Sequence, residues 1–529
     1  MKIVSTEQMR EIEHYSEEMG ISPYQLMEQA GLAFAQTLQT FLGGNIAGKT
    51  VVAFIGPGNN GADGLIASRH LNIWGARLIV YLCSERSNVE QNFTLLDDAS
   101  IEIVQINDPT YFDRLNIDLP NADIVIDAIL GIGRTRQLSG TVKKITLRIN
   151  QERLSRKNLT VASLDLPTGL NANTGEIDES SVDPDITISL GYPKVGFFKF
   201  PGATRIGQLL VADIGLPTNV PVNHLPTLLT TDWAAKNLPL RSRDSNKGSF
   251  GKVMVLAGSE NYIGAAFLAC MGAARVGAGN IMLATTGNVL RIVATLMPDT
   301  TYLPLLEDQL GGYESSAAEK VLHTLSDRDA LLVGCGLGTH QTTRKLVRGV
   351  SLGAPRPTPS MVLDADALNT LAETDNWWEQ LRFGCIMTPH PKEMARLLKT
   401  TVREVQEDRI ACARHAALQW GVTVILKGAF TVIASPEGNI RINPFANPIL
   451  ATSGTGDVLA GMITGFIAQN VPPYDAACLG TFIHGATGEA LTARYGDRGA
   501  LASELLPLIP TTIKDIIGRT FMPVISQYL

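Results

Sequence analysis

Residues 447–461, NPILATSGTGDVLAG, place a glycine-rich turn directly before an apolar helical pattern. After the turn, apolar residues recur at helical spacing: Val458, Leu459, Met462, Ile463, Phe466 and Ile467. A helix start of this kind presents unpaired backbone N–H groups at the positive end of the helix dipole, where phosphate binds. Asp457 falls in the first turn, so the sequence predicts a carboxylate beside an anion site. The alternative is that Asp457 only favours its own helix start.

Outward from this stretch, apolar β-rich runs alternate with helical patterns in both halves of the chain. Residues 1–45 predict helices, and strand patterns begin at 51–56 (VVAFIG) and recur as far as 208–217. Helices are predicted between these strands, among them 88–99 and 141–153. The alternation favours parallel strands covered on both faces, which is a doubly wound α/β sheet.

A second domain is predicted after a connecting segment. Residues 217–250 are rich in Pro, Asn, Ser and Thr without a sustained period, and we interpret them as an inter-domain linker and domain entry. We therefore expect one domain at 1–216 and another at 251–529. The second domain again alternates strands and helices, with a long helix at 402–420 and a hairpin across 436–438 (PEG). Its carboxyl end reads as helical and rich in Ala and Gly.

Length and composition limit the possible classes of protein. The 529 residues are too many for one ordinary core, and a hydrophobic content of 45% is ample for burial. No apolar run reaches the roughly 18 residues of a membrane span, and the acidic, amphipathic amino terminus argues against a signal peptide, so we expect a cytoplasmic protein. The six cysteines form no CxxC motif, and a formal charge of −7 gives no reason to expect nucleic acid or an anionic membrane as partners.

Three strand patterns of the first half are followed by glycine-rich loops with polar side chains: 56–64 (GPGNNGADG), 127–140 (DAILGIGRTRQLSG) and 164–175 (LDLPTGLNANTG). The first loop offers Asn59, Asn60 and Asp63, and each of the others contains an aspartate near the strand end. Because open α/β sheets bind ligands at the carboxyl ends of their strands, we expect the loops to converge on one crevice. For the first loop alone, a solvated turn with Asx hydrogen bonds is the alternative.

Together with 200–217 (FPGATRIGQLLVADIGLP), these loops resemble the epimerase domain of the NAD(P)H-hydrate repair enzymes over nearly the whole first half. The resemblance implies a potassium ion held by Asn60, Asp127 and Thr168, an oxygen-lined site that suits a hard cation. It implies that the hydrated dinucleotide contacts Asn59, Asn60, Gly61, Ala62, Asp63, Gly131, Ile132, Gly133, Arg134, Thr135, Arg136, Gln137 and Asp165. Asp165 is the predicted proton-handling group, with Asp127 as a competitor. The chain departs from the family's usual Gly at Ala62 and from its usual Ser at Thr168.

Further motifs of the second half are weak signals when each is taken alone: 258–268 (GSENYIGAAFL), 333–340 (VGCGLGTH), 364–368 (DADAL), 388–393 (TPHPKE) and 427–431 (KGAFT). Asp366 is better interpreted as a helix cap than as a ligand. His390, between two prolines, could be a turn residue, and Lys427 could be a solvated lysine beside a β-turn.

In order and over this length, the motifs resemble the ADP-dependent dehydratase domain of the same repair enzymes, a branch of the ribokinase-like α/β kinases. The resemblance implies that the adenine nucleotide contacts Lys427, Gly428, Ala429, Phe430, Thr431, Gly454, Thr455 and Gly456. It implies that the hydrated nicotinamide faces Ala265, Gly336 or Gly338, His390 and Asp457. The turn at 390–393, HPKE, departs from the family's usual HPGE.

The implied mechanism uses Asp457 as a general base. Hydration of NADH leaves a hydroxyl on the nicotinamide ring, and hydroxide is a poor leaving group. Asp457 would deprotonate that hydroxyl for attack on the terminal phosphate of ADP or ATP, while the N–H groups of 454–456 hold the transferring phosphoryl group. We expect magnesium to be bound mainly through the nucleotide phosphates and water.

The sequence thus predicts a two-domain α/β enzyme. A Rossmann-like amino-terminal domain interconverts the R and S hydrates of NADH and NADPH, and a ribokinase-like domain dehydrates the S form with ADP, releasing AMP and phosphate. The alternative is a ribokinase-like vitamin or sugar kinase with a non-catalytic amino-terminal scaffold. We expect a homo-oligomer that binds NADHX or NADPHX and ADP or ATP, with no nucleic acid and no membrane partner.

Overall fold

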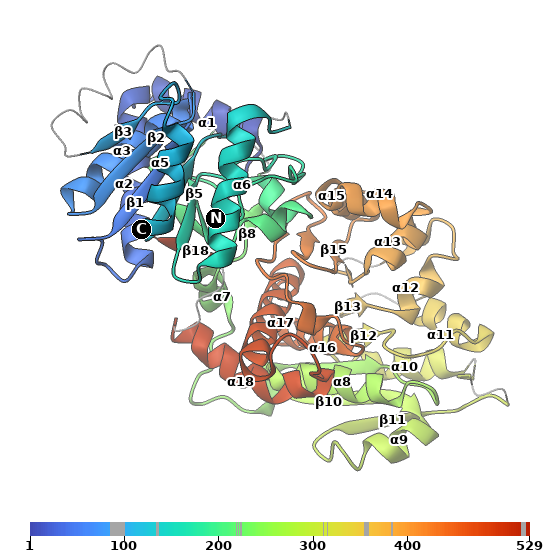
Figure 1. The fold of residues 1–529 in the computed structure, drawn as a ribbon. Helices are drawn as coiled ribbons and strands as arrows, with labels where there is room; N and C mark the ends of the chain where they lie inside the picture. Colours follow the sequence, from blue (N-terminus) through green and yellow to red (C-terminus); the bar gives the residue numbers. More distant parts are fainter. Residues whose placement is uncertain are drawn as a thin grey trace. The chain divides into compact units, whose positions relative to one another are not determined.

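The computed structural model describes residues 1–84, 101–133, 137–217, 219–220, 222, 225–309, 312–314, 316–353, 359–381, 384–519 and, for the backbone alone, 525–528. The predicted helix 88–99 lies outside these residues. The chain forms two compact units, one of Met1–Leu225 together with the carboxyl-terminal end and one of Pro226–Pro523 (Figure 1). Among the described helices, none has the length and apolar character that crossing a membrane requires.

The first unit is built on an eight-stranded sheet of order β18-β7-β6-β5-β4-β1-β2-β3 in which every pairing is parallel. Its strands are β1 Thr50–Ile55, β2 Arg77–Leu82, β3 Glu102–Val104, β4 Ile124–Ala128, β5 Thr160–Leu164, β6 Ile186–Leu190, β7 Gln208–Ala212 and β18 Ile525–Tyr528. Its α-helices are α1 Thr6–Glu18, α2 Pro23–Phe41, α3 Asn59–Ile73, α5 Tyr111–Asp118 and α6 Gly140–Ser155.

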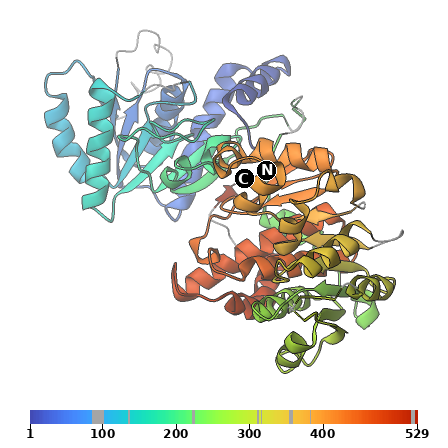
Figure 2. The same cartoon turned by 90° about the vertical axis from the view of Figure 1, so that its right-hand side faces the viewer.

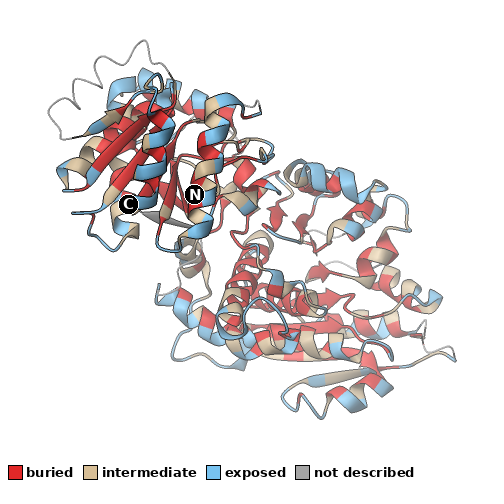
Figure 3. Ribbon diagram, viewed as in Figure 1, coloured by how far each residue is buried: buried red, intermediate tan, exposed pale blue. Residues whose placement is uncertain are grey.

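Alternate residues of β1 face two different cores, because successive side chains of a strand point to opposite faces. Val51 packs with residues of α2 and α3, whereas Val52 packs with residues of α5 and α6. Figure 3 shows the central strands β1, β4, β5 and β6 of this sheet as largely buried. The doubly wound α/β sheet predicted from the alternating patterns is therefore confirmed.

The carboxyl end of the chain differs from the prediction. We expected the second domain to continue to residue 529, but β18 pairs in parallel with β7 of the first unit, with Ile525 opposite Leu209. Backbone hydrogen bonds to a distant strand create this element. The pattern of a four-residue segment is too short to predict such pairing.

The second unit contains a ten-stranded sheet of order β11-β10-β9-β12-β13-β14-β15-β16-β17-β8. Its strands are β8 Thr227–Leu228, β9 Lys252–Leu256, β10 Asn280–Thr286, β11 Thr301–Leu305, β12 Ala330–Val333, β13 Ser360–Leu363, β14 Ile386–Met387, β15 Thr423–Leu426, β16 Val432–Ala434 and β17 Ile440–Ile442. Its α-helices are α7 Thr231–Asn237, α8 Ile263–Arg275, α9 Gly287–Val293, α10 Ala317–Leu325, α11 Gln341–Leu352, α12 Asp366–Leu371, α13 Pro391–Leu398, α14 Val402–Glu407, α15 Arg409–Trp420, α16 Thr455–Ala468, α17 Pro473–Tyr495 and α18 Ala502–Ile517.

Most predicted elements of this unit are present, and the predicted hairpin across PEG is formed by β16 and β17. The predicted helix 402–420 is two helices, because the Asp408 side chain accepts a hydrogen bond from the Ala411 N–H and starts α15 anew. The predicted linker contributes β8 and α7 to the second unit. Helices α9 and α13 and strand β11 lie where no element was predicted. Short strands at a sheet edge depend on their neighbours more than on their own pattern.

Helix α16, which follows the glycine-rich turn, is buried along almost its whole length. With α8 and α17 it contributes to one core against β9, β12 and β13, and the orange-to-red ribbons of residues 455–517 lie together in Figure 2. Glycines allow α16 and α8 to approach closely. A Cβ at Gly461 would lie 2.0 Å from the Ala269 carbonyl oxygen, and one at Gly272 would lie 2.4 Å from the Val458 carbonyl oxygen.

Gly461→Ala is therefore expected to destabilise the second unit by about 1–3 kcal/mol, the usual cost of overpacking a core. Urea unfolding followed by tryptophan fluorescence measures this. Gly264→Ala is the matched control, because a Cβ there meets no atom within 4 Å. Equal stability of the two variants would contradict the close packing of α16 on α8.

Candidate functional site

The three glycine-rich loops of the first unit converge, because β1, β4 and β5 are neighbours in its sheet. They line a cleft of about 500 Å³ together with residues of α1 and α2. The predicted substrate residues that line it are Asn59, Asn60, Asp63, Gly131, Ile132, Gly133 and Asp165. This confirms that one crevice forms at the carboxyl ends of the strands.

Six other predicted residues of this site do not line the cleft or lie outside the described residues. Gly61 and Ala62 are buried in the first turn of α3, and a Cβ at Gly61 would lie 2.1 Å from the Gly56 carbonyl oxygen. Gln137 is exposed and is not among the described lining residues. Arg134, Thr135 and Arg136 lie outside the described residues.

The proposed potassium ligands are held at these strand ends. Asp127 is fully buried, and its Oδ1 accepts a hydrogen bond from the Thr168 hydroxyl at 2.6 Å. Its Oδ2 accepts from the Thr168 N–H at 2.8 Å and from the Ser163 hydroxyl at 2.9 Å. Burial raises the pKa of Asp127, and these hydrogen bonds oppose that rise. The amide nitrogen of Asn60 is buried without a hydrogen-bond partner among the described residues.

Asp165 is fixed by contacts that the sequence did not reveal. Its φ of 65° lies in the left-handed region, which is unusual for a residue other than glycine. Its Oδ1 accepts hydrogen bonds from the Leu190 N–H at 3.0 Å and from the ammonium of the buried Lys194. Neither Lys194 nor Glu13, which also lines the cleft, was predicted. Glu13 is a half-buried carboxylate beside the buried residues Met9 and Ile12 of α1, and its place next to the apolar face is a signal by which it could have been found.

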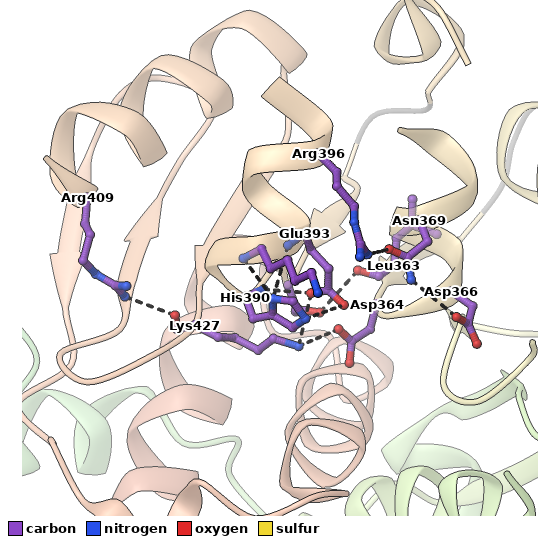
Figure 4. Close-up of polar contacts among 11 residues, drawn as sticks. Leu363, Asp364, Asp366, Asn369, His390, Glu393, Arg396, Arg409 and Lys427 are labelled. Atoms are coloured by element: carbon purple, nitrogen blue, oxygen red, sulfur yellow. Dashed lines mark hydrogen bonds and ion pairs between the residues drawn. The ribbon is translucent and has the colours of Figure 1, made fainter. Parts of the chain in front are cut away.

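In the second unit, the glycine-rich turn before α16 and the turn after β15 come together. A Cβ at Gly456 would lie 3.5 Å from Lys427 Nζ, and Lys427 donates to Asp364 Oδ1 at 2.7 Å (Figure 4). Asp457 lies in the first turn of α16, and its carboxylate, the Asp364 carboxylate and Cys335 Sγ lie within 4.8 Å of one another. Burial and the neighbouring Asp364 charge raise the pKa of Asp457 to about 7.

His390 begins α13 and faces the same group of charges. Its Nδ1 accepts hydrogen bonds from the Lys392 N–H at 3.1 Å and the Glu393 N–H at 3.2 Å, so it caps the helix (Figure 4). Burial, with the charge of Lys427, lowers the pKa of His390 and leaves its ring neutral near pH 7. Burial raises the pKa of Glu393, which lies 4.0 Å from Lys427.

The prediction that Asp366 caps a helix is wrong. The cap residue of α12 is Ala365, without a side-chain cap hydrogen bond, and Asp366 lies in the first turn. Its Oδ2 instead accepts a hydrogen bond from the Gly338 N–H at 2.8 Å. It therefore holds the predicted substrate loop.

Next to Gly338 lies a cleft of about 540 Å³. It is lined by Thr339, Arg344, Asn369, Thr370, Ala372, Glu373 and Arg396.

The remaining predicted residues of this site adopt conformations that suit tight turns. Gly336 has a φ of 61°, and a Cβ there would lie 2.8 Å from that of Ala265. In the 427–431 turn, Gly428 and Phe430 have positive φ values, Ala429 lies between them, and the Thr431 hydroxyl donates to the Gly428 carbonyl at 2.8 Å. Before α16, Gly454 caps the helix with a φ of 93°, and the Thr455 hydroxyl donates inward to the Leu450 carbonyl.

Comparisons with known proteins identify the family of the chain. Residues 23–196 match the family described as YjeF-related protein N-terminus, and residues 253–511 match the family described as NAD(P)H-hydrate dehydratase. The bifunctional NAD(P)H-hydrate repair enzyme of Moorella thermoacetica is 35% identical over 98% of this chain and 97% of its own length. That of Thermofilum pendens is 31% identical over 100% of this chain and 99% of its own length. A crystal structure of the Bacillus subtilis ADP/ATP-dependent NAD(P)H-hydrate dehydratase, co-crystallised with ATP/Mg2+, is 31% identical, covers 56% of this chain and 100% of its own, and has a TM-score of 0.46. Because its relatives match it from end to end, the chain belongs to the family of bifunctional NAD(P)H-hydrate repair enzymes.

Proposed function

We propose that the first unit interconverts the R and S hydrates of NADH and NADPH and that the second unit dehydrates the S hydrate with ADP. The observation that carries the second activity is the position of Asp457. A carboxylate with a pKa of about 7 lies in the first turn of a helix whose glycine turn adjoins the Lys427 ammonium. That pKa suits a general base near neutral pH, and the turn suits a phosphoryl group.

Each group near Asp457 has a role in this reaction. Asp457 takes the proton of the ring hydroxyl, and the hydroxyl oxygen attacks the terminal phosphate of the nucleotide. The N–H groups of 454–456 and the Lys427 ammonium hold the phosphoryl oxygens. AMP leaves as the phosphoryl group is transferred to the ring oxygen. Phosphate is a far better leaving group than hydroxide, so its elimination, with loss of a proton from the neighbouring ring carbon to solvent, restores the ring double bond of the reduced nicotinamide. Neutral His390 and the Gly338 loop border the ring.

Magnesium fits this site as a companion of the nucleotide. The Asp364 carboxylate is already paired with Lys427, and Cys335 is a poor ligand for a hard cation, so the side chains present do not form a magnesium cage. When bound through the nucleotide phosphates, magnesium neutralises their negative charge. Asp457 then remains available to accept a proton.

A potassium ion fits the first unit. Asp127 and Thr168 bring a buried carboxylate and a hydroxyl together. The buried amide nitrogen of Asn60 has no hydrogen-bond partner among the described residues, so no such bond fixes the orientation of the Asn60 amide group. A hard, oxygen-rich donor set of this kind suits a hard monovalent cation. It would fix the loops that line the cleft.

Thr168→Val is expected to remove the response of the epimerase to potassium, because it deletes one hydroxyl ligand. Epimerisation is measured by chromatographic separation of the two hydrates in potassium or lithium chloride. The wild type and Thr168→Ser are expected to be faster in potassium, since Ser keeps the oxygen. A Thr168→Val variant that still distinguishes the two salts would contradict this ligand.

The test of the whole proposal is to mix the protein with both NADHX epimers and ADP and to follow the near-ultraviolet absorbance of reduced nicotinamide. Conversion of both epimers is the expected result. Conversion of only one epimer would remove the function of the first unit. A stable phosphoester that accumulates without recovery of NADH would identify a kinase in place of the dehydratase.

A further inference from the structure

Four carboxylates, an arginine and one buried lysine line the cleft of the first unit: Glu13 and Glu17 on α1, Asp63 on α3, Asp165 at the end of β5, Arg10 and Lys194. Among these carboxylates, Asp165 is the one that accepts hydrogen bonds from Lys194 and from the Leu190 N–H. Hydrogen bonds and a positive charge both favour the ionised form of a carboxylate, and Asp165 receives both.

Glu13 and Asp63 are in a different electrostatic situation. Burial and the charge of Asp165 raise the pKa of both groups. Lys194 and Arg10 oppose that rise at Glu13, and Glu17 adds to it. In the described part of the chain, the hydrogen bonds that fix Asp165 have no counterpart at either carboxyl group. The cleft therefore combines a carboxylate paired with a lysine and two carboxyl groups whose pKa values are raised, which is the arrangement that separates an acid from a base.

Hydrogen bonds hold the start of α1, the helix that carries Glu13, against the segment that contains Lys194. Just before α1, the Val4 N–H donates to the Pro193 carbonyl and the Val195 N–H donates to the Val4 carbonyl, both at 3.0 Å. The first residue of α1, Thr6, donates its N–H to Asn173 Oδ1 at 2.8 Å. The helix that carries Glu13 is thus tied to the segment that contains Lys194 and to the loop after β5.

We propose that Glu13 is the general acid and Asp165 the general base of the epimerase reaction, an assignment that rests on the proposed function. Glu13 lies on an element separate from the predicted potassium ligands, whereas Asp63 shares the first turns of α3 with Asn60. An acid on one element and a base on another allow water to leave and to add at different faces of a ring.

The bonds that change follow from the chemistry of the hydrate. Water adds to an enamine at the carbon attached to nitrogen, so the hydroxyl lies next to the ring nitrogen. Glu13 gives its proton to that hydroxyl, the C–O bond breaks, and the nitrogen lone pair forms a C=N bond as water leaves. Water then adds to the other face of the same carbon, Asp165 takes its proton, and the electron pair returns to nitrogen. One water is lost and one gained, and the proton returns from Asp165 to Glu13 through solvent.

Glu13→Gln tests the assignment. We expect the rate of epimerisation to fall by about 10²–10⁴-fold, as when a positioned acid is removed. In the wild type, the rate should decline as pH rises and Glu13 loses its proton, and the variant should lack this alkaline limb. Glu11→Gln, an exposed position on the same helix, is the matched control and should keep both the rate and the limb. Glu13→Asp retains an acid and should recover part of the activity, which distinguishes chemistry from misfolding.

Two further measurements can overturn the assignment. In H2¹⁸O, the epimerised hydrate should carry ¹⁸O at its hydroxyl during enzymatic turnover, and product that keeps its original oxygen would contradict C–O cleavage. An Asp63→Asn variant that loses the alkaline limb while Glu13→Gln keeps it would make Asp63 the acid. A wild-type protein without epimerase activity would remove the proposed function itself, whereas an active wild type with equally active Glu13→Gln removes this assignment alone.

Discussion

Asp457→Asn lowers the rate of ADP-dependent dehydration of S-NADHX by about 10²–10⁴-fold, the usual loss when a positioned general base is removed. Asparagine has the same shape but cannot accept the proton of the ring hydroxyl. The Asp457 side chain lies where burial and the Asp364 charge disfavour a second negative charge. Removing its charge should therefore preserve the fold. The measurement is the recovery of reduced nicotinamide under saturating ADP.

The pH dependence gives an independent check on Asp457. Its pKa is raised to about 7, and only the ionised form accepts a proton, so the wild-type rate should fall about tenfold for each pH unit below that value. Asp457→Asn should lose this acidic limb, while the exposed Asp497→Asn control should keep it. Epimerisation should continue in both variants. A variant that retains the wild-type rate and limb would refute the role of Asp457.

Lys427→Met is expected to destabilise the second unit by about 3–5 kcal/mol, because it leaves the Asp364 carboxylate buried without its partner. Glu393, 4.0 Å from the same ammonium, loses a neutralising charge as well. The free energy of unfolding is measured with urea, following tryptophan fluorescence. Four of the five tryptophans, Trp233, Trp377, Trp378 and Trp420, lie in this unit and report its unfolding.

The double variant Lys427→Met, Asp364→Asn separates stability from function. Removing both charges should restore most of the lost stability, since replacing both members of a buried ion pair is often nearly neutral. Dehydratase activity should remain very low in the single and double variants, because the ammonium that holds the nucleotide phosphates is absent from both. A double variant as unstable as the single one would show that the stability of the unit does not depend on this pair.

Much of the fold was predictable because it depends on local patterns. Alternation of β-rich and helical runs predicted two α/β units, and burial of alternate residues of β1 on two faces of the sheet has the same origin. The glycine turn before α16 was likewise predictable, because a helix start needs only nearby residues. The pairing of β18 with β7 was missed because it depends on a remote partner. The break of the long helix at Asp408 was missed for a different reason: it is a local cap inside a pattern that is helical on both sides.

By itself the sequence determined which loops end the strands and which carboxylates and glycines they carry, and these identified the family. Only the tertiary structure decided which charged partners those carboxylates meet. Lys194 reaches Asp165 from the segment after β6, Lys427 reaches Asp364 from the turn after β15, and Glu13 enters the cleft from the amino-terminal helix. The charge of a buried group depends on how far it lies from water and from other charges. A linear sequence specifies neither of these distances.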